Sequence, residues 1–140
     1  MLLVETMYEY SIKNVVRIVD GDTVDVEIDL GFSLTKKERI RLAGIDTPET
    51  RTRNDEEKKL GIDAKEYLTM RLDACENLIV KTEKDGKYGR MLGWLFDGNK
   101  TINSDMVDLG YAWVYGGGSK SNDLKELKEK RGIFIDNNEK

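Results

Sequence analysis

Apolar and polar residues alternate along the first part of the chain in the way expected for β-strands. In the stretch TVDVEIDLG, Val24, Val26 and Ile28 share one face, and the acidic residues between them share the other. A run rich in β-branched residues at 12–19 precedes this stretch, and the segment ERIRLAGI at 38–45 follows it. These patterns predict three consecutive strands. Asp22 has the parity of the apolar face, so we expect its carboxylate to point inward, where an unpaired charge is costly.

Helical spacing replaces this alternation in the middle of the chain. Asn54 followed by Glu57 predicts a capping box, in which the helix begins after Asn54 and continues to about residue 75. Gly61 falls inside this helix, and the pattern offers no reason for it. One face of the helix is expected to be buried, and the apolar positions along it are Leu60, Ala64, Leu68 and Leu72.

The second half of the chain returns to short strands and then to helices. We expect strands at 77–83 and 91–98, a turn at 84–90, a short helix at 103–110, an aromatic segment at 111–115 and a charged helix at 123–132. This order favours a small, curved antiparallel sheet closed into a barrel. The predicted fold is α+β and mainly β, an OB-type five-stranded barrel with three helices packed outside.

Composition and charge narrow the possible functions. At 140 residues we expect a single domain over 1–140, with a core at about 12–131 and flexible ends. The net charge is −4, which argues against a uniformly basic surface that coats nucleic acid. Charge is nevertheless local: residues 36–53 carry six basic and three acidic groups, whereas residues 20–29 carry five acidic groups and no basic one. Such an arrangement suits a metal site that faces a phosphate.

Residue types that are missing exclude several mechanisms. The chain has no histidine and one cysteine, Cys75, which excludes Ser-His-Asp and Cys-His hydrolases and any cysteine-based zinc cluster. Cys75 is expected to be a small buried residue. The first ten residues do not resemble a signal peptide, and no apolar run is long enough to predict a membrane span. We therefore expect a cytoplasmic or host-cell intracellular protein, secreted only if a leader has been removed.

Three motifs occur in order along the chain: DGDTV at 20–24, RLAGIDTPE at 41–49 and KYGR at 87–90. Each motif alone is weak, but the three together, with the expected strands between them, are specific. Over about residues 12–131 the chain resembles the thermonuclease family, that is, the staphylococcal nuclease-like domains. This resemblance implies a calcium-dependent phosphodiesterase on an OB-fold, which hydrolyses single-stranded DNA and RNA with little sequence preference.

The resemblance also implies the site residues. Two carboxylates and a carbonyl would give Ca²⁺ the hard oxygen ligands that it prefers, and arginines would donate forked hydrogen bonds to the phosphate. A carboxylate near the proline would accept a proton from the attacking water. The implied metal ligands are Asp22, Asp46 and the Thr47 carbonyl; the catalytic residues are Arg41, Glu49 and Arg90; the substrate contacts are Lys87 and Tyr88, with Trp113 and Tyr115 as weaker candidates.

Each assignment has a plainer alternative. Asp22 could be a turn residue, Arg41 could simply pair with Asp46 or Glu49, and Arg90 and Lys87 could be exposed. The aromatic residues of segment 111–115 could instead close the core. For the whole protein, the main alternative is a catalytically silent module of the same fold that binds nucleic acid or protein, and a third is a plain barrel with a structural ion. The presence of all the implied carboxylates and arginines favours an enzyme. We expect a monomer without an obligate protein partner and without a membrane partner.

Overall fold

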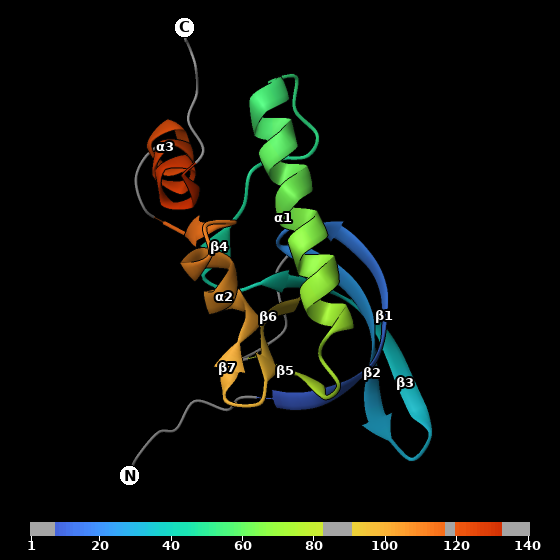
Figure 1. Cartoon of the computed structure of the whole chain (residues 1–140). Coiled ribbons are helices and arrows are strands. Elements are labelled where there is room, and N and C mark those ends of the chain that lie inside the picture. The colour runs from blue at the N-terminus through green and yellow to red at the C-terminus, as the bar shows by residue number, and fades with distance from the viewer. Residues whose placement is uncertain (1–7, 83–90, 117–119, 133–140) are drawn as a thin grey trace, which may run out of the picture.

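The computed structural model describes residues 8–82, 91–116 and 120–132, and within them five strands form a closed barrel (Figure 1). Three helices pack outside this barrel, which confirms the predicted α+β, mainly β, OB-type architecture. The barrel strands are β1 (Tyr8–Asp20), β2 (Thr23–Gly31), β3 (Leu34–Leu42), β5 (Leu78–Thr82) and β6 (Met91–Asp97).

The barrel closes through a parallel pair of strands. Neighbours in the order β3-β2-β1-β5-β6 are antiparallel, but β3 and β6 are parallel, with Ile40 opposite Met91 and Leu42 opposite Gly93. The expected antiparallel sheet is therefore present except at the closure, where the pair is parallel. The reason is parity, because an odd number of strands that alternate in direction leaves the first and last pointing the same way.

The predicted strand at 38–45 is two elements in the structure. β3 ends at Leu42, the chain turns at Gly44 with a φ of 77°, and Ile45–Asp46 forms the separate strand β4. β4 pairs with β8 (Trp113–Val114), not with the barrel. This break takes Asp46 out of the barrel wall and brings it beside the segment that follows α2.

α1 (Asp55–Asp73) and α2 (Ile102–Asp108) pack against the barrel, and α3 (Lys120–Arg131) lies further out (Figure 1). The predicted apolar stripe of α1 is buried against the core. Asn103 fastens α2 to the barrel, because its amide accepts the Leu95 N–H (3.0 Å) and donates to the Ala43 carbonyl (2.9 Å). Lys128 of α3 binds Glu56 of α1 at 2.8 Å.

The core lies inside the barrel and under α1. Val24, Val26 and Ile28 are buried as the alternation predicted, and Leu95 and Met106 are also buried there. β7 (Lys100–Thr101) extends the edge of β6 beside α2. In the described part of the chain, no helix combines the length and the apolar character needed to cross a membrane.

Cys75 follows α1 and is only partly buried, although it packs against the core. Burial raises the pKa of its thiol, and the neighbouring Asp97 carboxylate raises this pKa further. A thiol with a raised pKa is a poor nucleophile at neutral pH. Cys75 therefore fits the packing role that was expected, with more exposure than expected.

Candidate functional site

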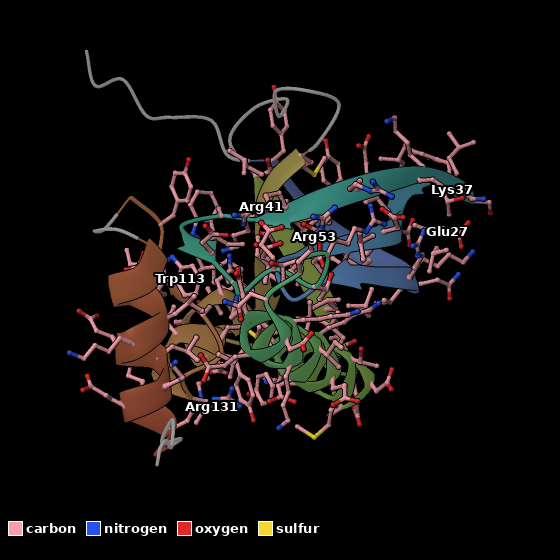
Figure 2. All side chains as sticks on the ribbon, turned by 90° about the horizontal axis from the view of Figure 1, so that it is seen from above. Glu27, Lys37, Arg41, Arg53, Trp113 and Arg131 are labelled. Atoms are coloured by element: carbon pink, nitrogen blue, oxygen red, sulfur yellow. The ribbon has the colours of Figure 1, made fainter. Side chains whose placement is uncertain are left out.

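The site is built around Arg41, near the end of β3. Its Nη1 donates to the carbonyls of Leu42 (2.7 Å) and Ile45 (2.9 Å), so the main chain fixes the guanidinium. Its Nη2 lies 3.4 Å from a carboxylate oxygen of Asp22 and 3.4 Å from one of Asp46. Figure 2 shows Arg41 on β3; in this view Trp113 lies between Arg41 and α3. One guanidinium nitrogen is therefore shared by two carboxylates that come from different elements.

Asp22 lies in the turn between β1 and β2 and is buried, as its parity predicted. Its carboxylate accepts the Thr23 hydroxyl at 2.9 Å, and its carbonyl accepts the Leu42 N–H at 2.8 Å. The register of β2 and β3 places Thr23 directly opposite Arg41. This pairing brings Asp22 to Arg41. The sequence analysis considered only Asp46 and Glu49 as ion-pair partners of Arg41.

Asp46 lies on β4 and accepts the Thr47 N–H at 3.0 Å. Burial raises the pKa of the Asp46 carboxyl and the nearby Asp22 carboxylate raises it further, while Arg41 and the Thr47 amide act in the opposite direction. Both carboxylates lie 3.4 Å from the same Arg41 nitrogen, so the two acids are neighbours. Arg41 alone thus does not offset the repulsion between these two acids.

The donor set of this site fits a hard cation. Over residues 8–82, 91–116 and 120–132, no three His, Cys, Asp or Glu side chains converge, so side chains would contribute the Asp22 and Asp46 carboxylates. Ca²⁺ commonly completes such a set with main-chain carbonyls and water. The buried Thr47, the third predicted ligand, follows Asp46 directly. Two mutually repelling carboxylates are the arrangement that a bound cation would relieve.

Glu49 lies on the loop that joins β4 to α1, just after the buried Pro48. Its side chain is exposed, and its main-chain N–H donates to Oε2 of Glu57 at 3.1 Å. Of the two ion-pair partners considered for Arg41, the structure shows Asp46, and it adds Asp22. The contact between Glu49 and Glu57 was missed, because the sequence pattern assigned Glu57 to the helix cap.

Lys87, Tyr88 and Arg90 lie outside the described residues, so their predicted roles stay predictions. Arg90 directly precedes Met91, the first residue of β6. Met91 lies opposite Ile40, and the next residue, Leu92, lies opposite Arg41. The KYGR motif is thus followed directly in sequence by β6, the strand that pairs with β3, which carries Arg41.

The aromatic residues after α2 divide into two groups. Tyr111 stacks on Tyr67 with ring centroids 4.5 Å apart, and the Arg131 guanidinium lies 4.3 Å from the Tyr111 ring centroid, so Tyr111 belongs to the packing. Trp113 is half-buried and pairs with Asp46 in the β4–β8 ladder. Tyr115 is 67% exposed. The two weaker substrate candidates therefore lie close to the site. Trp113 is on β8, the strand that pairs with β4, and Tyr115 directly follows β8.

Comparison with known proteins identifies similar sequences. A family model described as "Staphylococcal nuclease homologue" matches residues 39–131. The chain is 32% identical to the thermonuclease of Staphylococcus hyicus, over 70% of this chain and 56% of the relative. It is 34% identical to a micrococcal nuclease of Shigella flexneri, over 89% of this chain and 74% of the relative. It is also 34% identical to an uncharacterized protein of Bacillus anthracis, over 71% of this chain and 45% of the relative.

Proposed function

The chain belongs to the staphylococcal nuclease family, and from this membership and the geometry of the site we propose that it is a calcium-dependent phosphodiesterase. Its proposed substrates are DNA and RNA, cut with little sequence preference by attack of water on phosphorus. The chain spans about half the length of several relatives that it matches, for example 45% of the Bacillus anthracis protein and 56% of the thermonuclease. We therefore propose this activity for the present chain and draw no conclusion about the remaining length of these relatives.

The observation that carries the proposal is the shared guanidinium of Arg41. Two main-chain carbonyls hold Nη1, so the group stays in place without relying on its carboxylate contacts. Nη2 faces the two aspartates, which would attract a cation, and this cation together with Nη2 would attract a phosphate oxygen. An arginine cannot lose its proton at working pH and can stabilise the charge that builds up on phosphorus.

Asp22 and Asp46 would hold Ca²⁺, with the Thr47 carbonyl as a further ligand, and the ion would supply positive charge beside the phosphate. Glu49 would act as the general base: its carboxylate accepts a proton from the water whose oxygen bonds to phosphorus, as one P–O bond of the diester breaks. An exposed carboxylate on a loop stiffened by Pro48 suits that role, because water can reach it and the loop restricts its movement. A positioned base of this kind contributes about 10²–10⁴-fold.

Bases of a bound strand would meet Trp113 and Tyr115, which flank the site with exposed or partly exposed rings. Stacking on aromatic rings tolerates every base, which supports a low sequence preference. Arg90, Lys87 and Tyr88 are proposed as additional phosphate contacts from the resemblance alone.

A cleavage assay tests the proposal. Single-stranded DNA and RNA are incubated with the protein and Ca²⁺, with and without chelator, beside Glu49→Gln. We expect cleavage by the parent protein, loss of cleavage with chelator, and a fall of about 10²–10⁴-fold in the variant. Glu66→Ala, on the exposed side of α1, is the control and should cleave like the parent.

Two outcomes would separate the alternatives. Binding of DNA without cleavage under any divalent cation would favour the silent binding module. Equal cleavage by Glu49→Gln would remove the general-base assignment and leave the metal and arginine assignments to be tested separately.

A further inference from the structure

Glu57 makes a contact that its position at the start of α1 does not require. Its side chain is 7% exposed, and its Oε2 accepts the N–H of Glu49 at 3.1 Å. In an ordinary capping box, the carboxylate at this position turns back to the amide of the N-cap residue. Here the side-chain oxygen of Asn54 accepts the Glu57 N–H at 2.9 Å. The main-chain N–H of Asn54 donates to the Thr52 hydroxyl at 3.2 Å. The buried carboxylate of Glu57 thus binds the Glu49 loop.

The next turn of the same helix face touches the same loop. A Cβ added to Gly61 would lie 2.6 Å from the Glu49 carbonyl oxygen and 2.8 Å from the Pro48 carbonyl oxygen. No other residue fits between the helix and the loop without moving one of them. This close approach explains the glycine that the sequence pattern left without a reason. Glu57 and Gly61, four residues apart, therefore hold one short segment of main chain.

The turn that carries Asp22 rests on the same face one turn further along. A Cβ on Gly21 would lie 2.7 Å from the Ala64 Cβ and 3.2 Å from a methyl carbon of Thr47. We call Glu57, Gly61 and Ala64 the loop-facing side of α1. This side contacts both the turn that carries Asp22 and the loop that carries Pro48 and the proposed base.

We infer that Glu57 is a positioning residue for the reaction: it holds the main chain of Glu49, and so sets where the proposed base lies relative to the carboxylates. This inference rests on the proposed nuclease function. A buried carboxylate is costly unless it is hydrogen-bonded, so its place under an exposed loop needs a compensating contact. The Glu49 amide supplies one, and Gly61 limits how far the loop can shift.

The test compares Glu57→Ala with Glu57→Gln. The glutamine keeps an oxygen that can accept the Glu49 N–H, whereas alanine removes it. We expect kcat to fall by about 10- to 100-fold in Glu57→Ala with KM nearly unchanged, and to recover to within a few-fold of the parent in Glu57→Gln. In a Glu49→Gln background, Glu57→Ala should cause little further loss, because both changes act through one group.

A merely structural role would give a different result. If both Glu57 variants lose stability and activity in parallel, or if folded Glu57→Ala keeps the parent kcat, the inference is wrong. Hydrogen exchange of the Glu49 amide gives a readout without catalysis: protection should fall in Glu57→Ala and return in Glu57→Gln. If the parent cleaves nothing, the proposed function fails, and the exchange experiment still decides whether Glu57 holds the loop. Unchanged protection in Glu57→Ala would overturn the inference.

Discussion

Two arginines of this protein each lie between two aspartates, and the two clusters behave differently. The site cluster comprises Arg41, Asp22 and Asp46; the structural cluster comprises Arg71, Asp97 and Asp105. The arginine side chains are 13% and 17% exposed, so burial does not distinguish the two. The difference must come from how the contacts are made.

In the structural cluster, each carboxylate has a nitrogen of its own. Nη1 of Arg71 lies 2.8 Å from Asp97, Nε lies 3.1 Å from Asp105, and Lys100 adds a second cation 3.1 Å from Asp105. The Arg71 hydrogen bond is the main reason that the pKa of Asp97 is lowered. Charges and hydrogen bonds are matched, and the cluster joins α1 to α2 and to the end of β6.

In the site cluster, the two carboxylates share one nitrogen at 3.4 Å each, while main-chain carbonyls take the other. The pKa of Asp46 is raised, by burial and then by Asp22. Among the described residues, this cluster has more negative charge than its arginine offsets. Matched contacts indicate a structural role, whereas crowded carboxylates indicate a place for a ligand.

The largest expected difference between the clusters concerns catalysis. Arg41→Lys should lower kcat/KM by about 10²–10³-fold, because an ammonium group cannot bind two carbonyls and also present a fork to the phosphate. Arg71→Lys should keep cleavage within a few-fold, but lower the free energy of unfolding by about 1–2 kcal/mol, since one nitrogen cannot reach both separate carboxylates. Steady-state kinetics and urea unfolding of both variants measure this contrast. Equal activity losses would contradict the division into two roles.

The second expected difference concerns the response to calcium. At a Ca²⁺ concentration of about 100 times Kd, the parent should gain about 2.7 kcal/mol of unfolding free energy over the protein in chelator. Asp46→Asn should lose most of this gain, because one of the two carboxylates is gone. Asp97→Asn is the matched control from the structural cluster and should keep it. A calcium response that survives Asp46→Asn would place the ion elsewhere.

The sequence predicted the barrel, its buried strand faces and the apolar stripe of α1, because these follow from local periodicity. It did not predict the parallel closure of β3 on β6 or the pairing of β4 with β8, which depend on how distant segments meet. The inward direction of Asp22 came from alternation alone. Its grouping with Arg41 and Asp46 came from the family resemblance, since no local pattern brings three separate segments together.

Two residues show where local reasoning stopped. Gly61 had no explanation until the loop of Pro48 and Glu49 was placed on α1. Glu57 fitted a capping box, and half of that prediction is confirmed, because Asn54 does accept the Glu57 N–H. The Glu57 carboxylate also accepts the Glu49 main-chain N–H, a contact that a capping box does not include. In both cases the role of the residue comes from a contact with the loop that carries Glu49. The pattern of residues within one helix carries no information about such a contact.

The smallest expected difference concerns pH in the presence of chelator. The folded protein raises the pKa of Asp46 above its ordinary value of 3.8, so the native state binds protons more tightly there than the unfolded state. Stability from this group is present below that value and is lost as pH rises through the folded pKa. The pKa of Asp97 is lowered, so its contribution is present above 3.8 and is lost as pH falls through the folded pKa.

Substituting the two aspartates should therefore have opposite effects at neutral pH. Asp46→Asn should raise the free energy of unfolding, because it removes a crowded charge and keeps an oxygen for the Thr47 amide. Asp97→Asn should lower the free energy of unfolding, because Arg71 loses one of its two charged partners. Urea unfolding in chelator at neutral pH and near pH 4 measures both, and the gain from Asp46→Asn should shrink at the lower pH, where the parent carboxyl is partly protonated. If Asp46→Asn instead destabilises the protein as Asp97→Asn does, then Arg41 satisfies both carboxylates, and the site cluster is a second structural one.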